Sequence, residues 1–171
     1  MKAIFFLLLF TPLIAFSQNA DVYLKLTDAS GQQIKGESVM KGFERWIRAT
    51  TINTGGKNNT QITFTMPVSG ASADLKRALA SGSKLPGGQI SVLTPSLTGG
   101  TPVVSYIIKM ENIMVSSCSE AMGCNNVMNT SVTLEVTRIG WIYYQTDKSG
   151  MQTISRKFGW DAATQAEWTN F

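Results

Sequence analysis

The chain has 171 residues, of which 15% are charged, and its formal net charge is +4. It contains no histidine, which removes His-based acid–base catalysis, the Ser-His and Cys-His dyads and the commonest metal ligand. No run of basic residues exceeds two, whereas nucleic-acid-binding proteins cluster Lys and Arg among aromatic side chains. Composition therefore argues against an enzyme and against a nucleic-acid partner.

The N-terminus has the layout of a cleavable secretory signal. Lys2 precedes an apolar run over residues 3–16, and Ala15 and Ser17 supply the small residues of a cleavage site. The run is too short to span a bilayer comfortably, so a membrane anchor or a buried strand is the weaker interpretation. We expect residues 1–17 to be removed as a signal peptide, and residues 18–171 to form one domain that is exported to the periplasm or the extracellular space, without stable membrane insertion.

The first half of this domain predicts three strands joined by polar loops. Apolar and polar residues alternate over residues 21–27, 45–53 and 61–68, as the two faces of a half-buried sheet require. Residues 34–42 contain two glycines and predict an irregular connection, and the Gly- and Asn-rich residues 54–59 predict an exposed loop.

One helix is predicted after the third strand. Ser72 is a suitable N-cap, and Asp74 follows in the first turn, where a negative charge favours the helix dipole. Apolar residues at helical spacing continue to Gly82, which predicts the end of the helix. The apolar stripe is best explained as core packing.

The second half predicts the longest strands. Residues 89–94 form a short strand, and two alternating segments follow at 103–117 and 130–144. A turn at 147–150 leads to a last strand at 151–158. Strands of this length tend to curl or close, because closure removes edges that would pair with other chains. We therefore expect a mainly β, antiparallel, barrel-like domain with one short α-helix over an open end.

Two cysteines lie in the loop between the two long segments. Cys118 and Cys124 are six residues apart, and an exported chain meets oxidising conditions, so they are candidates for a disulfide bond. Metal binding is the alternative, but it would need further ligands in a chain without histidine.

No other pattern predicts a catalytic, cofactor-binding or metal site. The acidic residues are scattered singly, and the glycine pairs do not lie in a strand-to-helix phosphate loop. Several aromatic residues line either a carbohydrate or peptide surface, or the core, and we favour core anchoring for Trp141 and Trp160. Aromatic residues near the C-terminus suggest docking against a neighbouring chain. The aromatic candidates are Trp46, Trp141, Tyr143, Tyr144, Trp160, Trp168 and Phe171.

Four short motifs, taken in order, resemble those of the Hcp (haemolysin-coregulated protein) family. They are the Lys-Gly-Glu-Ser turn at 35–38, the helix at 74–82, the strand end at 115–117, and the corner Gly159-Trp160-Asp161. The resemblance covers residues 21–168, and it is the order and spacing of the motifs that make it specific.

This resemblance implies a structural role and no cofactor. Hcp protomers are β-barrel-like and form hexameric rings, which stack into the hollow tube of type VI secretion systems. A contractile sheath expels the tube, which carries effector proteins in its lumen. The implied partners are therefore further copies of the chain, with spike, sheath and effector proteins, and Gly159, Trp160 and Asp161 are expected to form a structural corner.

Two features depart from the family pattern. Family members usually carry no cleavable signal, and the loop at 53–59 is shorter than the Gly-rich excursion with which they contact adjacent rings. We therefore expect rings that stack weakly. A free-standing exported Hcp-like binding or envelope protein is the main alternative, and a cryptic hydrolase is the least supported.

Overall fold

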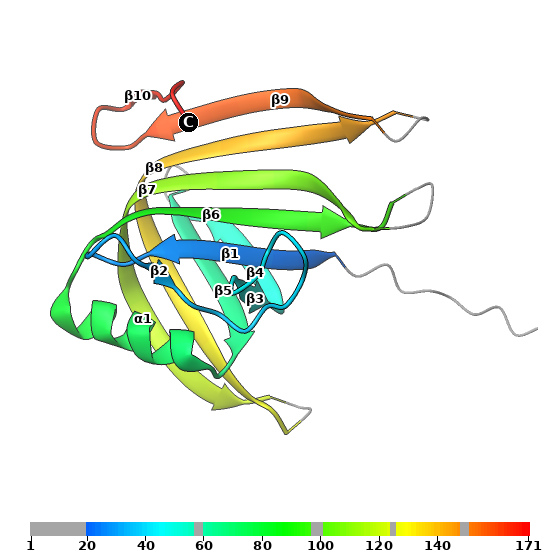
Figure 1. Cartoon of the computed structure of the whole chain (residues 1–171). Coiled ribbons are helices and arrows are strands. Elements are labelled where there is room, and N and C mark those ends of the chain that lie inside the picture. The colour runs from blue at the N-terminus through cyan, green and yellow to red at the C-terminus, as the bar shows by residue number, and fades with distance from the viewer. Residues whose placement is uncertain (1–19, 57–59, 97–100, 124–125, 148–150) are drawn as a thin grey trace, which may run out of the picture.

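The computed structural model describes residues 20–56, 60–96, 101–123, 126–147 and 151–171 (Figure 1). The expected signal peptide, residues 1–17, lies outside the described residues. Within the described residues the chain is mostly strand, with one helix packed at the bottom of the view. The elements are β1 (Asp21–Thr27), β2 (Gln33–Ile34), β3 (Ile47–Ala49), β4 (Thr51–Gly55), β5 (Gln61–Pro67), α1 (Gly70–Ser81), β6 (Leu85–Thr94), β7 (Val103–Met122), β8 (Met128–Thr146), β9 (Gln152–Asp161) and β10 (Ala166–Glu167).

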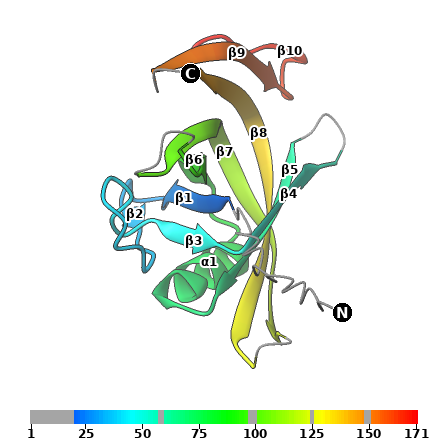
Figure 2. The same ribbon diagram turned by 90° about the vertical axis from the view of Figure 1, so that its right-hand side faces the viewer.

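A long antiparallel hairpin of β7 and β8 forms the centre of the sheet. β7 pairs with β6, which pairs with β1, and β1 also pairs with β2 and β3. On its other side β8 is shared between two strands: its first half pairs with β5 and its second half with β9. The sheet therefore divides along β8, and β9 leaves the barrel-like part as a separate wall (Figure 2).

The strands of the barrel-like part surround the core, but the backbone hydrogen bonds between them do not form one continuous ladder. The strand expected at 45–53 is interrupted at Thr50, so that β3 pairs with β1 whereas β4 pairs with β5. Thr50 itself donates its backbone N–H to the carbonyl of Thr65, at 2.8 Å. The expected mainly antiparallel, barrel-like fold with one short helix is confirmed, although the sheet is not closed.

The inward-facing side chains form one hydrophobic core. Along the sheet, Leu24, Ile90, Ile108 and Trp141 lie opposite one another on successive strands and are all buried. Because side chains alternate between faces, this row marks the inner face of the sheet from β1 to β8. The same row continues to Phe158 on β9, which is half exposed because the core ends before it.

Helix α1 covers the lower end of this core. Its N-cap is Ser69 and not Ser72, whose hydroxyl instead accepts the Ser69 N–H at 3.1 Å. Asp74 consequently lies beyond the first turn and pairs with Arg77 at 3.5 Å. Gly82 ends the helix as expected, in the left-handed conformation that glycine adopts without strain.

Candidate functional site

The corner predicted at Gly159-Trp160-Asp161 connects β9 to its neighbours through charged hydrogen bonds. The Asp161 carboxylate accepts from the Arg138 Nε at 2.7 Å and from the N–H groups of Ala163 and Thr164 at 2.9 and 3.3 Å. Arg138 also reaches Glu111 on β7, at 3.2 Å. The Arg138 hydrogen bond holds the pKa of Asp161 below its usual value. Asp161 therefore joins the turn after β9 to both strands of the central hairpin.

Gly159 makes room for the C-terminal segment. It lies opposite Gly140 on β8, and the Phe171 ring packs over both glycines on the outer face. A Cβ at either position would approach the Phe171 ring within 2.4 Å, closer than real Cβ contacts. Lys157 also holds the C-terminal segment in place. Its ammonium group donates to the Phe171 carbonyl at 2.7 Å and lies 4.2 Å from the centre of the Phe171 ring.

The C-terminal aromatic residues therefore contact their own chain in this protomer. Trp168 donates its backbone N–H to the Gly159 carbonyl at 2.9 Å, and its ring lies 4.8 Å from that of Phe171. These contacts lie within one chain, and docking of the same aromatics on a neighbouring chain stays a prediction. Of the core candidates, Trp141 is buried as expected and Trp160 packs against the core.

The Lys-Gly-Glu-Ser motif pairs with the residues that lead into β3. Gly36 donates to the Arg45 carbonyl at 2.8 Å, and Ser38 donates to the Trp46 carbonyl at 3.1 Å. A Cβ at Gly36 would lie 2.3 Å from the Trp46 carbonyl oxygen, so this close approach of two backbones requires glycine. The motif is therefore a backbone clamp.

The two candidate cysteines are separated by an extended strand. Cys118 lies on β7 opposite Val132, where burial raises the pKa of its thiol. Cys124 lies outside the described residues, so the bond stays a prediction. Extended chain rises about 3.3 Å per residue, which places Gly123 roughly 16 Å from Cys118, whereas bridged Cα atoms lie within about 7 Å. A disulfide would require the end of β7 to bend back.

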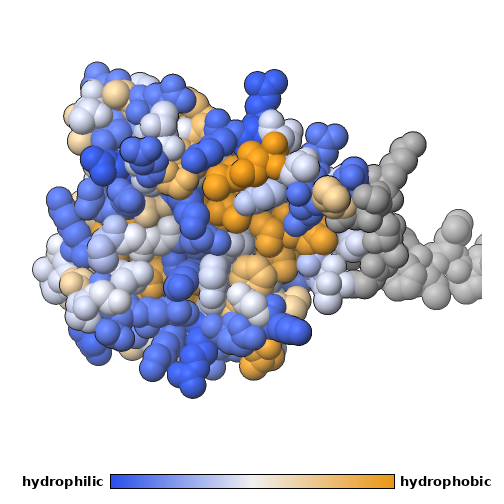
Figure 3. Space-filling view, turned by 45° about the horizontal axis from the view of Figure 1, so that its top comes forward, coloured by the Kyte–Doolittle hydropathy of each residue, from blue (hydrophilic) through white to orange (hydrophobic). Residues whose placement is uncertain are grey.

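Exposed hydrophobic side chains lie both on the strands, such as Phe158 and Met122, and in connections, such as Val39. Figure 3 shows a patch of hydrophobic surface to the right of the centre of one face, with mainly hydrophilic surface to its left. No helix in the described part of the chain is long and apolar enough to cross a membrane.

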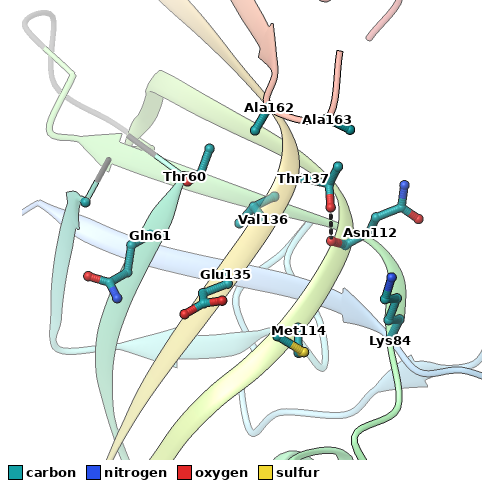
Figure 4. A pocket seen from close by; sticks show the side chains of 11 residues that line it. Thr60, Gln61, Lys84, Asn112, Met114, Glu135, Val136, Thr137, Ala162 and Ala163 are labelled. Carbon is teal, nitrogen blue, oxygen red and sulfur yellow. Dashed lines mark hydrogen bonds between the residues drawn. The ribbon is translucent and has the colours of Figure 1, made fainter. Parts of the chain in front are cut away.

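A shallow depression between β5, β7 and β8 is the first of the open concavities that the described residues form. It has a volume of about 530 Å³, and Lys84 comes to it from the connection between α1 and β6, whereas Glu135 comes from β8 (Figure 4). Thr137 donates its hydroxyl to the Asn112 carbonyl at 3.2 Å, where β7 is irregular and Asn112 has a positive φ. Its described lining holds a single carboxylate, so it lacks the pair that glycoside hydrolysis uses. Nowhere among the described residues do three or more metal-binding side chains gather.

The second concavity is aromatic and lies below the wall formed by β9. We call it the aromatic cleft. Its volume is about 660 Å³. The Trp141 and Phe158 rings stack with centres 5.6 Å apart, and the Tyr106 and Tyr143 rings stack at 4.7 Å. Burial and the Tyr143 hydroxyl raise the pKa of Tyr106 above its usual value, so Tyr106 stays neutral at physiological pH. The cleft is lined by Thr54, Tyr106, Trp141, Tyr143, Arg156, Lys157 and Phe158.

The alternating pattern that marked Tyr143 as a strand residue could not reveal this cleft. The cleft exists because β9 leaves the barrel-like part. Tyr143 and Phe158 therefore remain 46% and 49% exposed, although both lie on the inner face of the sheet. A sequence signal was present only in the aromatic residues at 141, 143 and 158, which lie at alternate positions on facing strands.

Solved structures resemble this fold closely despite low sequence identity. Hcp1 of Salmonella typhimurium has a TM-score of 0.71 and 20% identity, and the match covers 87% of this chain and 99% of that protein. A type six secretion system protein gives 0.74 and 22%, covering 88% of this chain and all (100%) of that one. The secreted protein Hcp3 of Pseudomonas aeruginosa gives 0.65 and 19%, with coverage of 84% and 98%.

No curated protein sequence matches the chain. By contrast, the sequence model of the family described as "Type VI secretion system effector, Hcp" matches residues 23–143, most of the 171-residue chain. The matched region begins in β1, ends in β8 and includes the Lys-Gly-Glu-Ser clamp, the helix and the central hairpin. The chain belongs to the Hcp family of type VI secretion system proteins.

Proposed function

We propose that this protein is a structural subunit that assembles into hexameric rings of the type VI secretion tube. Family membership supports this role, and so does the wall of β8 and β9, whose inner face continues past the core with half-exposed aromatic side chains. Exposed apolar surface of this kind marks sites of protein association. This wall is the observation that carries the proposal, because a monomer gains nothing from leaving it uncovered.

The partners follow from this role. A ring needs further copies of the chain, and a tube would meet sheath and spike proteins outside and effector proteins in its lumen. The absence of histidine from the sequence and the lone carboxylate in the shallow depression support a structural rather than an enzymatic function.

Export is the second part of the proposal. The apolar run at residues 3–16 favours a chain that leaves the cytoplasm by its own signal, and the related Hcp3 is described as a secreted protein. The intact mass of protein recovered from the native host should lack residues 1–17. A full-length cytoplasmic chain would contradict export.

In the exported protein, peptide mapping without reductant should show Cys118 linked to Cys124. A free Cys118 thiol in that protein would contradict the bond.

The same run favours one competing function, a free-standing exported Hcp-like binding or envelope protein. Oligomeric state separates the two. Exported protein should elute in size-exclusion chromatography with a light-scattering mass of six protomers, and this mass should persist on dilution to the micromolar range. Stable interfaces that bury more than about 1,000 Å² survive such dilution. A protomer mass at every concentration would support the free-standing protein and remove the ring.

A further inference from the structure

The central hairpin extends past the core at both of its ends, and each end leaves apolar side chains exposed. The upper end forms the aromatic cleft. At the lower end, Met122 is 61% exposed, Met128 43% and Val68 44%. About 15 residues of β8 separate Met128 from Tyr143, which corresponds to about 50 Å of extended chain.

The three lower residues form one cross-strand row, which we call the methionine row. Met122 lies opposite Met128, and the Val68 N–H donates to the Met128 carbonyl at 3.0 Å. Thr130 is two residues after Met128 and therefore lies on the same face. It is buried, and its hydroxyl is hydrogen-bonded to the hydroxyl of Ser72 on α1, at 2.8 Å. The methionine row is thus an extension of the inner face that α1 does not reach.

The two surfaces are chemically complementary. Methionine side chains adapt to irregular spaces, and their thioether sulfurs pack favourably against aromatic rings. The aromatic cleft has one cation on its own face, Arg156 opposite Tyr143, and no described acidic residue lines it; the Lys157 ammonium is held on the outer face by Phe171. Glu120 lies two residues before Met122 on the same face, where its exposed pair with Lys76 at 2.6 Å leaves it accessible to a further cation.

We propose that the aromatic cleft of one copy receives the methionine row of a second copy. This joint rests on the proposed function, because it explains how copies of the chain associate. The two surfaces differ and lie at opposite ends of the hairpin, so the contact is heterologous and repeats from copy to copy. In a closed ring, each aromatic cleft is filled by the methionine row of one neighbour, and each methionine row fills the cleft of the other neighbour.

Two double variants test the joint, each removing one surface. Tyr143→Ser with Phe158→Ser alters the cleft, and Met122→Ser with Met128→Ser alters the row. All four side chains are at least 43% exposed, so folding is expected to be retained and is checked by circular dichroism. Met114→Ser with Met151→Ser is the matched control, because these residues are 39% and 64% exposed and belong to neither surface.

Each variant alone should sediment as a monomer, with an association constant reduced at least about 30-fold, as expected for the loss of interface anchors. The control should form the wild-type oligomer. An equimolar mixture of the two variants should form a dimer at high protein concentration, because one intact cleft meets one intact row and no second joint remains.

Three results would overturn the joint. Wild-type-like oligomers of either variant, or a mixture that stays monomeric, would show that these surfaces do not meet, while the wild-type ring and the proposed function would stand. A wild-type protein that is itself monomeric would remove the ring and the joint together.

Discussion

At the scale of single residues, the corner at the end of β9 depends on contacts that only particular side chains allow. Gly159 and Gly140 face each other and leave the space that the Phe171 ring fills. Asp161 is 6% exposed and gathers Arg138 and two backbone N–H groups around one carboxylate. The corner Gly159-Trp160-Asp161 lies where β9, β8 and the C-terminal segment meet. Its contribution to the free energy of unfolding can be measured.

Replacing Gly159 by alanine should destabilise the corner. Its new Cβ would lie 2.2 Å from the Trp168 carbonyl oxygen and 2.4 Å from the Phe171 ring, so the C-terminal segment must shift. Overpacking of this kind costs about 1–3 kcal/mol of unfolding free energy, measured by urea denaturation. Gly55→Ala is the control, because a Cβ there meets nothing within 4 Å. Equal stability of the two variants would show that Gly159 is not constrained.

Replacing Asp161 by asparagine should flatten the stability profile in acid. Because the pKa of Asp161 is lowered in the folded protein, its stabilisation is present above the unfolded value of about 3.9 and is lost as pH falls through the folded value. Wild-type unfolding free energy should therefore fall more steeply than that of the variant below about pH 4. Parallel profiles for wild type and Asp161→Asn would contradict this assignment.

At the scale of elements, period-two patterns predicted the strands well where one face is buried. The pattern failed at two places for identifiable reasons. β6 begins at Leu85, earlier than expected. The pattern missed this start because the inner-face position 88 is a glycine, which adds no apolar side chain to the alternation; a Cβ there would come within 2.7 Å of Leu26. The break at Thr50 depends on which strand each half pairs with, and that choice is tertiary.

The site was less predictable than the fold. The corner residues were identified by resemblance, but their partner Arg138 is 23 residues from Asp161 and carries no local signal. The aromatic cleft and the methionine row likewise exist only because the hairpin is longer than the core that covers it.

Helix α1 should contribute to stability mainly through its buried leucine. Leu75 is fully buried against the sheet, so Leu75→Ala should lower the unfolding free energy by about 2–5 kcal/mol. Leu79→Ala is the matched comparison and should cost less, because Leu79 is only partly buried. Thermal and urea unfolding of both variants would measure the difference, and a larger loss for Leu79→Ala would contradict the packing described.

At the scale of the whole molecule, the protomer is a barrel-like core crossed by a hairpin that is too long for it. The exposed ends of the hairpin explain why a chain with an ample core would still associate. The loop between β4 and β5, which includes residues outside the described part, is short in sequence, and we expect little contact between adjacent rings.

Catalysis should be absent from the assembled protein. Peptidase, esterase and glycosidase substrates should show no turnover above a heat-inactivated control, because histidine is absent and the shallow depression has a single carboxylate. Activity that is lost in Glu135→Gln, but kept in Glu167→Gln, would overturn the structural role.

Electron microscopy of the exported protein tests the ring most directly. Negatively stained particles should average to rings with six-fold symmetry and a central hole, and most should be single rings rather than long stacks. Small particles without rotational symmetry, at concentrations where the light-scattering mass is also that of one protomer, would contradict the claim that this chain builds a tube.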